Sequence, residues 1–219
     1  MLLIRGIQFL PRFLRFAVAS LLLALSIVLA PMAGAQDATP GVLPGQDPNA
    51  PCSNGRLRIG DLAIVNQSLE QGVKQATEEA RNWQADSRLY TLRLGCPLLT
   101  SGYQWEGVFF SETAQAFYST DTGVVEAVND EPSTIPVLDP AGIDLQETYR
   151  SLIRAGFTDD LLLGAAGGVT IRYSTDTHPF GPDSAPRNQV YAHVAVEMSG
   201  QVTDVWVSMA DGTIFRYLR

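Results

Sequence analysis

The sequence predicts an α+β fold in which two repeated units each place one helix on an antiparallel sheet. Two segments carry apolar residues at three- and four-residue spacings, which is the pattern of an amphipathic helix. Each is followed by segments in which apolar and polar residues alternate, as in half-buried strands. A connection at residues 131–143, rich in proline, separates the two series. The order helix, strand, hairpin thus occurs twice, either in tandem domains or in one fused layer.

The N-terminal segment has the features of a signal peptide. Three arginines precede an apolar run of about 15 residues that begins at Phe16, which is short for a membrane span. Small residues then follow at Ala33 and Ala35, where a signal peptidase requires them. We therefore expect residues 1–35 to be cleaved and the protein to be secreted or extracytoplasmic. An uncleaved anchor is the alternative.

The first unit is expected at residues 52–130, after a flexible linker at 36–51 that is rich in Pro, Gly, Asp and Asn. A helix is predicted from about Asn66 to Leu89, with Asn66 or Ser68 as its N-cap. Strands are predicted at 89–95 and, in three pieces, within 105–128.

The second unit is expected at residues 144–219. It opens with a helix at 144–157 that Asp144 would cap. A strand at 167–176, a loop at 177–188 and a hairpin that turns near 198–201 follow, and a last short strand ends the unit.

The pentapeptide Tyr-Ser-Thr-Asp-Thr occurs at 118–122 and again at 173–177. The two copies fall at different places in the two units. Tyr and Thr favour strands and Asp-Thr favours a turn, so we expect two strand ends with similar local chemistry. A shared ligand loop, or a duplication in another register, is the alternative.

The charge balance excludes some classes of partner. All 23 acidic residues follow Ala35, whereas three of the 15 basic ones precede it, which leaves 12 positive charges against 23 negative after cleavage. Binding to nucleic acid, or to an anionic membrane surface, needs a basic face. We expect neither partner, and no membrane contact beyond the signal segment.

The two cysteines, Cys52 and Cys96, predict one structural disulfide, because an even pair in an exported protein most simply forms a bridge. The bond would close a loop of 44 residues and stabilise the fold by about 3–4 kcal/mol.

Few residues suggest catalysis or metal binding. His178 and His193 are the only histidines, and 15 residues separate them. Asp176, His178 and Asp183 make a weak candidate for a metal loop, and the same loop with His193 is a candidate for a hydrolase or metal-dependent site. No nucleophile motif accompanies them, so we expect no catalytic residues, no bound metal and no cofactor.

The half-unit resembles a PepSY-type domain. The resemblance rests on the helix ending in NWQADSRL (82–89), on FYSTDTGVV (117–125) and on VWVSMADGTIF (205–215). It covers roughly residues 66–128 and 144–218, and the loop at 177–188 departs from it. A cystatin-like helix-on-sheet fold fits almost as well. The PepSY resemblance implies extracytoplasmic binding, and inhibition or chaperoning of secreted peptidases, without catalytic residues.

The sequence therefore leaves three functions open. The first is a non-enzymatic binding or inhibitory module that contacts a protein or peptide partner. The second is a secreted hydrolase or metal-dependent enzyme that uses the Asp176–Asp183 loop and His193. The third is a structural protein of the cell envelope.

Overall fold

The computed structural model describes residues 50–52, 55–97, 102–161, 163 and 168–218. The predicted signal peptide (1–35) and most of the predicted linker (36–51) lie outside the described residues. By its contacts the chain divides into Met1–Pro40 and Gly41–Arg219, and all of the described residues belong to the second unit.

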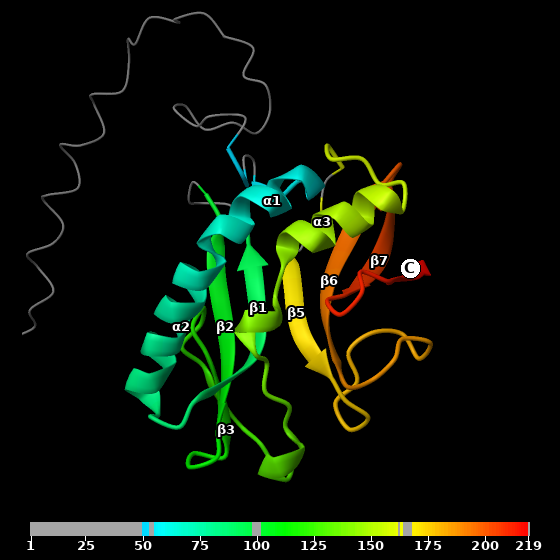
Figure 1. Ribbon diagram of the computed structural model, residues 1–219. Coiled ribbons are helices and arrows are strands. Elements are labelled where there is room, and N and C mark those ends of the chain that lie inside the picture. The colour runs from blue at the N-terminus through cyan, green and yellow to red at the C-terminus, as the bar shows by residue number, and fades with distance from the viewer. Residues whose placement is uncertain (1–49, 53–54, 98–101, 162, 164–167, 219) are drawn as a thin grey trace, which may run out of the picture. The chain divides into compact units, whose positions relative to one another are not determined.

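The described part of the chain is a mixed helix and strand structure, as the sequence predicts (Figure 1). Its helices are α1 (Leu62–Val65), α2 (Leu69–Trp83) and α3 (Leu145–Arg154). Its strands are β1 (Arg88–Gly95), β2 (Gln104–Ser111), β3 (Ala116–Ser119), β4 (Val125–Ala127), β5 (Val169–Ser174), β6 (Gln189–Met198), β7 (Gln201–Ser208) and β8 (Ile214–Leu218). Short 3₁₀ turns lie at Ile59–Asp61, Asn66–Ser68, Pro132–Thr134 and Pro140–Gly142.

All eight of these strands belong to one antiparallel sheet, in the order β4-β3-β2-β1-β5-β6-β7-β8. The first strand of each half, β1 and β5, pair with each other, with Leu92 opposite Ile171 and Leu94 opposite Val169. The sequence left two arrangements open, tandem domains or one fused layer. Because β1 pairs with β5, the strands form one fused layer.

The hydrophobic core lies between the sheet and the helices. Helix α2 packs over β1 and β2, and α3 packs over β7, on the same side of the sheet (Figure 1). Alternate strand residues enter this core, as pleated strands require. They include Leu92, Leu94, Phe109, Val169, Ile171, Ala192, Val194, Val196, Val205 and Val207.

The predicted cap of α3 is confirmed, whereas the first long helix, α2, has Ser68 at its N-cap position without a side-chain capping bond. The carboxylate of Asp144 accepts hydrogen bonds from the backbone N–H groups of Gln146 and Glu147. By contrast, the side chain of Asn66 accepts from the N–H of Leu145 (2.9 Å), so it caps the other helix. The hydroxyl of Ser68 donates to the carbonyl of Val65 instead of capping α2. The reason is that the chain already turns helically from Ile59, so α2 has no free start at Asn66.

Both copies of the repeated pentapeptide run from a strand end into a turn, as expected. The first leaves β3 after Ser119, and the N–H of Gly123 donates back to the Ser119 carbonyl. The second leaves β5 after Ser174 and starts the loop that precedes β6.

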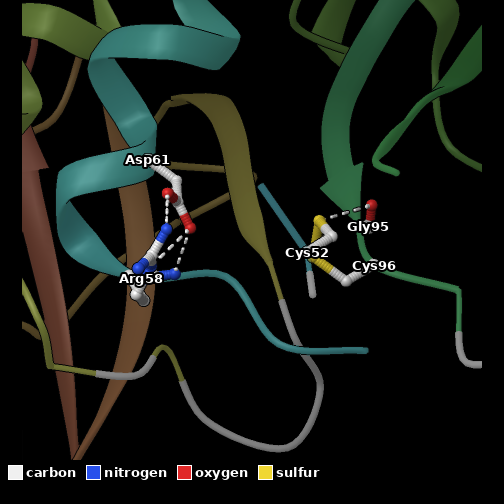
Figure 2. The surroundings of a disulfide bond; sticks show 5 residues. All are labelled: Cys52, Arg58, Asp61, Gly95 and Cys96. Carbon is white, nitrogen blue, oxygen red and sulfur yellow. Dashed lines mark hydrogen bonds and ion pairs between the residues drawn. A yellow bond between two sulfur atoms is a disulfide. The ribbon is translucent and has the colours of Figure 1, made fainter. Parts of the chain in front are cut away.

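The predicted disulfide between Cys52 and Cys96 is present (Figure 2), with Cα atoms 5.3 Å apart. It joins the segment that precedes the helices to the residue directly after β1. The Sγ of Cys52 lies 3.9 Å from the carbonyl oxygen of Gly95. A disulfide sulfur carries no hydrogen, so this approach is a packing contact.

An ion pair closes the turn at which the helical segment begins (Figure 2). The guanidinium of Arg58 donates to both carboxylate oxygens of Asp61, at 2.9 and 3.3 Å, and the backbone N–H of Arg58 donates as well. The Asp61 side chain is only 4% exposed. These bonds raise the pKa of Arg58 and compensate the burial of the Asp61 carboxylate.

A pH-dependent contribution to stability comes from Asp86. Its carboxylate accepts from the hydroxyl of Ser111 (2.7 Å) and the N–H of Thr113 (2.8 Å), and these bonds lower its pKa to about 2. Since the unfolded value is about 3.9, the stabilisation is present above pH 4 and is lost as the pH falls through 2.

The free energy of unfolding of the wild type should fall between pH 4 and pH 2. We expect this fall to be about 1 kcal/mol smaller in Asp86→Asn, after allowance for solvent screening. Urea unfolding at pH 7, 4 and 2 measures this loss. Glu126→Gln, at an exposed carboxylate on β4, is the matched control. An Asp86→Asn variant with the pH profile of the wild type contradicts the assignment.

Among the described residues, no helix has both the length and the apolar character that a membrane crossing demands.

Candidate functional site

The face of the sheet opposite α2 and α3, which we name the back face, carries a cluster of rings and charges. Its residues alternate with core residues: Arg172 follows Ile171, and His193 precedes Val194. The register places His193 opposite Trp206 and Arg172 opposite Tyr191. We name as the back-face cluster the residues Tyr90, Arg172, His178, Phe180, His193, Asp204 and Trp206.

Arg172 is the central cation of the cluster. Its guanidinium carbon lies 4.4 Å from the centre of the Tyr90 ring and 5.7 Å from that of Phe180. Such cation–π contacts contribute about 0.5–2 kcal/mol. Burial lowers the pKa of Arg172, although the nearby Tyr90 opposes this effect. No carboxylate forms an ion pair with Arg172 in the part of the chain that the structure describes.

His193, one of the two histidines of the cluster, is held by the carboxylate of Asp204. His193 Nε2 lies 2.8 Å from Oδ1 of Asp204, and the Asp204 side chain is 5% exposed. The imidazole also lies against two rings, with its centre 4.6 Å from that of Trp206 and 6.2 Å from that of Phe180. These contacts fix the orientation of the imidazole.

Two donors in the cluster are unsatisfied. Nε of Arg172 and Nε1 of Trp206 are buried and have no hydrogen-bond partner among the described residues. Because an unpaired buried donor costs about 1–3 kcal/mol, such groups are rare in folded proteins. The cluster therefore has two buried donors to which the described residues supply no acceptor.

The loop between β5 and β6 positions Phe180 over the cluster. Ser174, which is fully buried, accepts hydrogen bonds from the middle and from the end of this loop. Its hydroxyl accepts from the N–H of Phe180 (2.9 Å), and its carbonyl accepts from the N–H of Asn188 (2.7 Å). The hydroxyl of Tyr191 on β6 donates to the carbonyl of Pro186 (2.7 Å) and so connects the loop to the sheet. The loop at 177–188 is therefore the segment that completes the cluster.

The structure brings some of the predicted site residues together and separates others. His178 and His193 both belong to the cluster, but His178 lies edge-on to Tyr90 (6.4 Å), whereas His193 contacts Asp204. Asp176 and Asp183 are exposed, and Asp183 pairs with Arg187 at 3.7 Å. Within the described ranges, no group of three His, Cys, Asp or Glu side chains could hold a metal ion.

Sequence reasoning missed Arg172 and Asp204. Both are charged residues inside strands that otherwise alternate, and Asp204 is buried while Arg172 is half-buried. A charged residue in such a strand, with no opposite charge beside it in sequence, is the signal that was available.

Comparison with known proteins gives little further information. No family model matches the chain, and no curated protein matches it. Among solved structures, a Clostridium difficile 630 protein described as a "putative lipoprotein" is similar, with a TM-score of 0.44 and 10% identity over 68% of this chain and 93% of that one. A likeness of this size establishes neither a shared family nor a shared function.

Proposed function

We propose that this chain is a non-enzymatic binding module that contacts a protein or peptide partner through the back face of its sheet. The observation that carries the proposal is the back-face cluster, in which Arg172 lies between two aromatic rings without an acidic partner among the described residues. Half-buried aromatic residues and arginine are the residue types that dominate binding energy at protein interfaces.

The proposal includes export. The arginines and apolar run of residues 1–35 support a signal peptide, with a retained anchor as the alternative. The disulfide between Cys52 and Cys96 supports an oxidising, extracytoplasmic location.

The proposal also includes a repeat. Each half of the described chain has a helix followed by four antiparallel strands, which supports duplication of one unit. A PepSY-type or a cystatin-like origin of that unit stays a prediction. If it is PepSY-type, the partner belongs to the class of secreted peptidases.

Selection from a peptide library tests the proposal. We expect the purified protein to enrich peptides from a displayed 12-residue library, and we expect Phe180→Ala to weaken their binding at least about tenfold, as loss of an interface ring does. Ile64→Ala is the matched control, because Ile64 is 47% exposed and lies on α1, away from the cluster. Failure to enrich any peptide, or equal weakening by both substitutions, contradicts the proposal.

The hydrogen bond between His193 and Asp204 favours a second candidate, a hydrolase in which Asp204 orients His193 as a general base. This candidate predicts ester or amide hydrolysis that His193→Gln abolishes and His178→Gln leaves intact. Absence of turnover across a substrate panel removes it. A purely structural envelope protein, the third function, predicts no peptide enrichment.

A further inference from the structure

Resting on the proposed function, we infer that the back face recognises a single carboxylate of a peptide, flanked by apolar side chains, and that Arg172 binds it. The inference starts from the unsatisfied donors. Nε of Arg172 and Nε1 of Trp206 both have an N–H group and no acceptor among the described residues. Ring contacts connect them, since Phe180 lies against both Arg172 and His193, and His193 lies against Trp206.

The geometry around Arg172 favours a carboxylate. The guanidinium carbon lies over the Tyr90 ring, 4.4 Å from its centre. The donors of a guanidinium point outward in its plane, and the Nε donor of Arg172 has no acceptor among the described residues. A carboxylate matches two such parallel donors in one plane. Within the described part of the chain, Arg172 therefore lacks the partner that its shape suits best.

The charge of the protein favours one carboxylate over a run of them. The chain carries a formal net charge of −8, which repels polyanionic ligands at long range. Arg93 is a second cation on this face, two residue pairs along from Arg172, but Glu106 and Glu197 lie on the same face. Tyr90, Phe180 and Trp206 offer apolar contacts to the residues beside the bound carboxylate.

Access to Arg172 Nε requires a movement of its cover. The atom is buried, while the arginine as a whole is half-buried. Tyr90 belongs to a strand, whereas Phe180 belongs to the loop between β5 and β6. A rotation of the Phe180 side chain is the smaller change, so we expect its ring to turn away from Nε and to contact the apolar side chain beside the bound carboxylate.

Three short peptides test the inference on the full protein. They are Ac-Phe-Glu-Phe-NH2, with a side-chain carboxylate, Ac-Phe-Gln-Phe-OH, with a terminal carboxylate, and the neutral Ac-Phe-Gln-Phe-NH2. The readout is the nitrogen-15 NMR spectrum, in which Arg172 Nε–H and Trp206 Nε1–H give their own signals. We expect at least one carboxylate peptide to bind about tenfold or more tightly than the neutral one and to shift Arg172 Nε–H downfield. Comparison of the two carboxylate peptides shows which source of the group is recognised.

Two substitutions complete the test. Arg172→Met keeps an apolar stem and removes the donors, so it should abolish the preference for the carboxylate. Arg216→Met is the matched control, because Arg216 also lies over a ring, that of Phe157 at 4.7 Å, but donates to the Ala155 carbonyl. If Arg172→Met does not fold, the wild-type Nε–H signal still decides.

Equal binding of neutral and carboxylate peptides overturns the carboxylate inference and leaves the proposed binding face standing. An unmoved Arg172 signal at saturation also overturns it. Failure of the library selection, by contrast, overturns the proposed function itself.

Discussion

Replacing Cys52 and Cys96 together by alanine is expected to lower the free energy of unfolding by about 3–4 kcal/mol. The bond closes a loop of 44 residues that contains α1, α2 and β1, so its removal frees a large part of the unfolded chain. Domains of this size are stable by about 5–15 kcal/mol, so the loss is a substantial fraction of the total.

Guanidinium-induced unfolding measures this loss, and intact mass confirms the redox state. Wild-type protein unfolded in the presence of a reductant should match the double variant, which serves as the control. A loss under about 1 kcal/mol would show that the loop is already ordered without the bond.

Arg58→Met is expected to cost about 3 kcal/mol, because it leaves the carboxylate of Asp61 buried without its cation. Adding Asp61→Asn to this variant should recover part of the loss, since no charge then remains buried. The same unfolding measurement is made on the wild type, on Arg58→Met, on Asp61→Asn and on the double variant, which together form a double-mutant cycle.

The matched control is Arg150→Met, which breaks the pair between Arg150 and Glu147. Arg150 is 53% exposed, so we expect less than about 1 kcal/mol. Similar losses for Arg58→Met and Arg150→Met would show that burial of the carboxylate does not set the cost of removing its cation.

Local sequence patterns predicted most of the elements. Asp144 caps α3, and the hairpin between β6 and β7 turns at Ser199 and Gly200, which both have positive φ angles. These features depend on a few neighbouring residues, so one sequence suffices to find them.

Long-range contacts escaped prediction. The pairing of β1 with β5 joins segments about 80 residues apart, and no residue in either strand specifies the other as its partner. The side chain of Asn66 has the chemistry of a cap, but its target lies on another helix, 79 residues further along the chain.

The candidate site was predicted in part. His193 and the loop after β5 were identified as candidates, whereas Arg172 and Asp204 were not. The roles of those two residues depend on which rings and charges the sheet brings beside them, namely Tyr90 from β1 and His193 from β6. Tyr90 lies far from Arg172 in sequence, and His193 is 11 residues from Asp204, across the hairpin of β6 and β7.

The signals of the three tryptophan indoles test the account most directly, because the fold separates these residues. Trp206 lies on the back face, whereas Trp83 belongs to α2 and Trp105 donates to Ser68 on the helical side. On titration with a peptide selected by the protein, we expect the indole N–H signal of Trp206 to move while those of Trp83 and Trp105 stay in place. Movement of Trp83 or Trp105 with an unmoved Trp206 would place the binding surface on the helices and contradict the account.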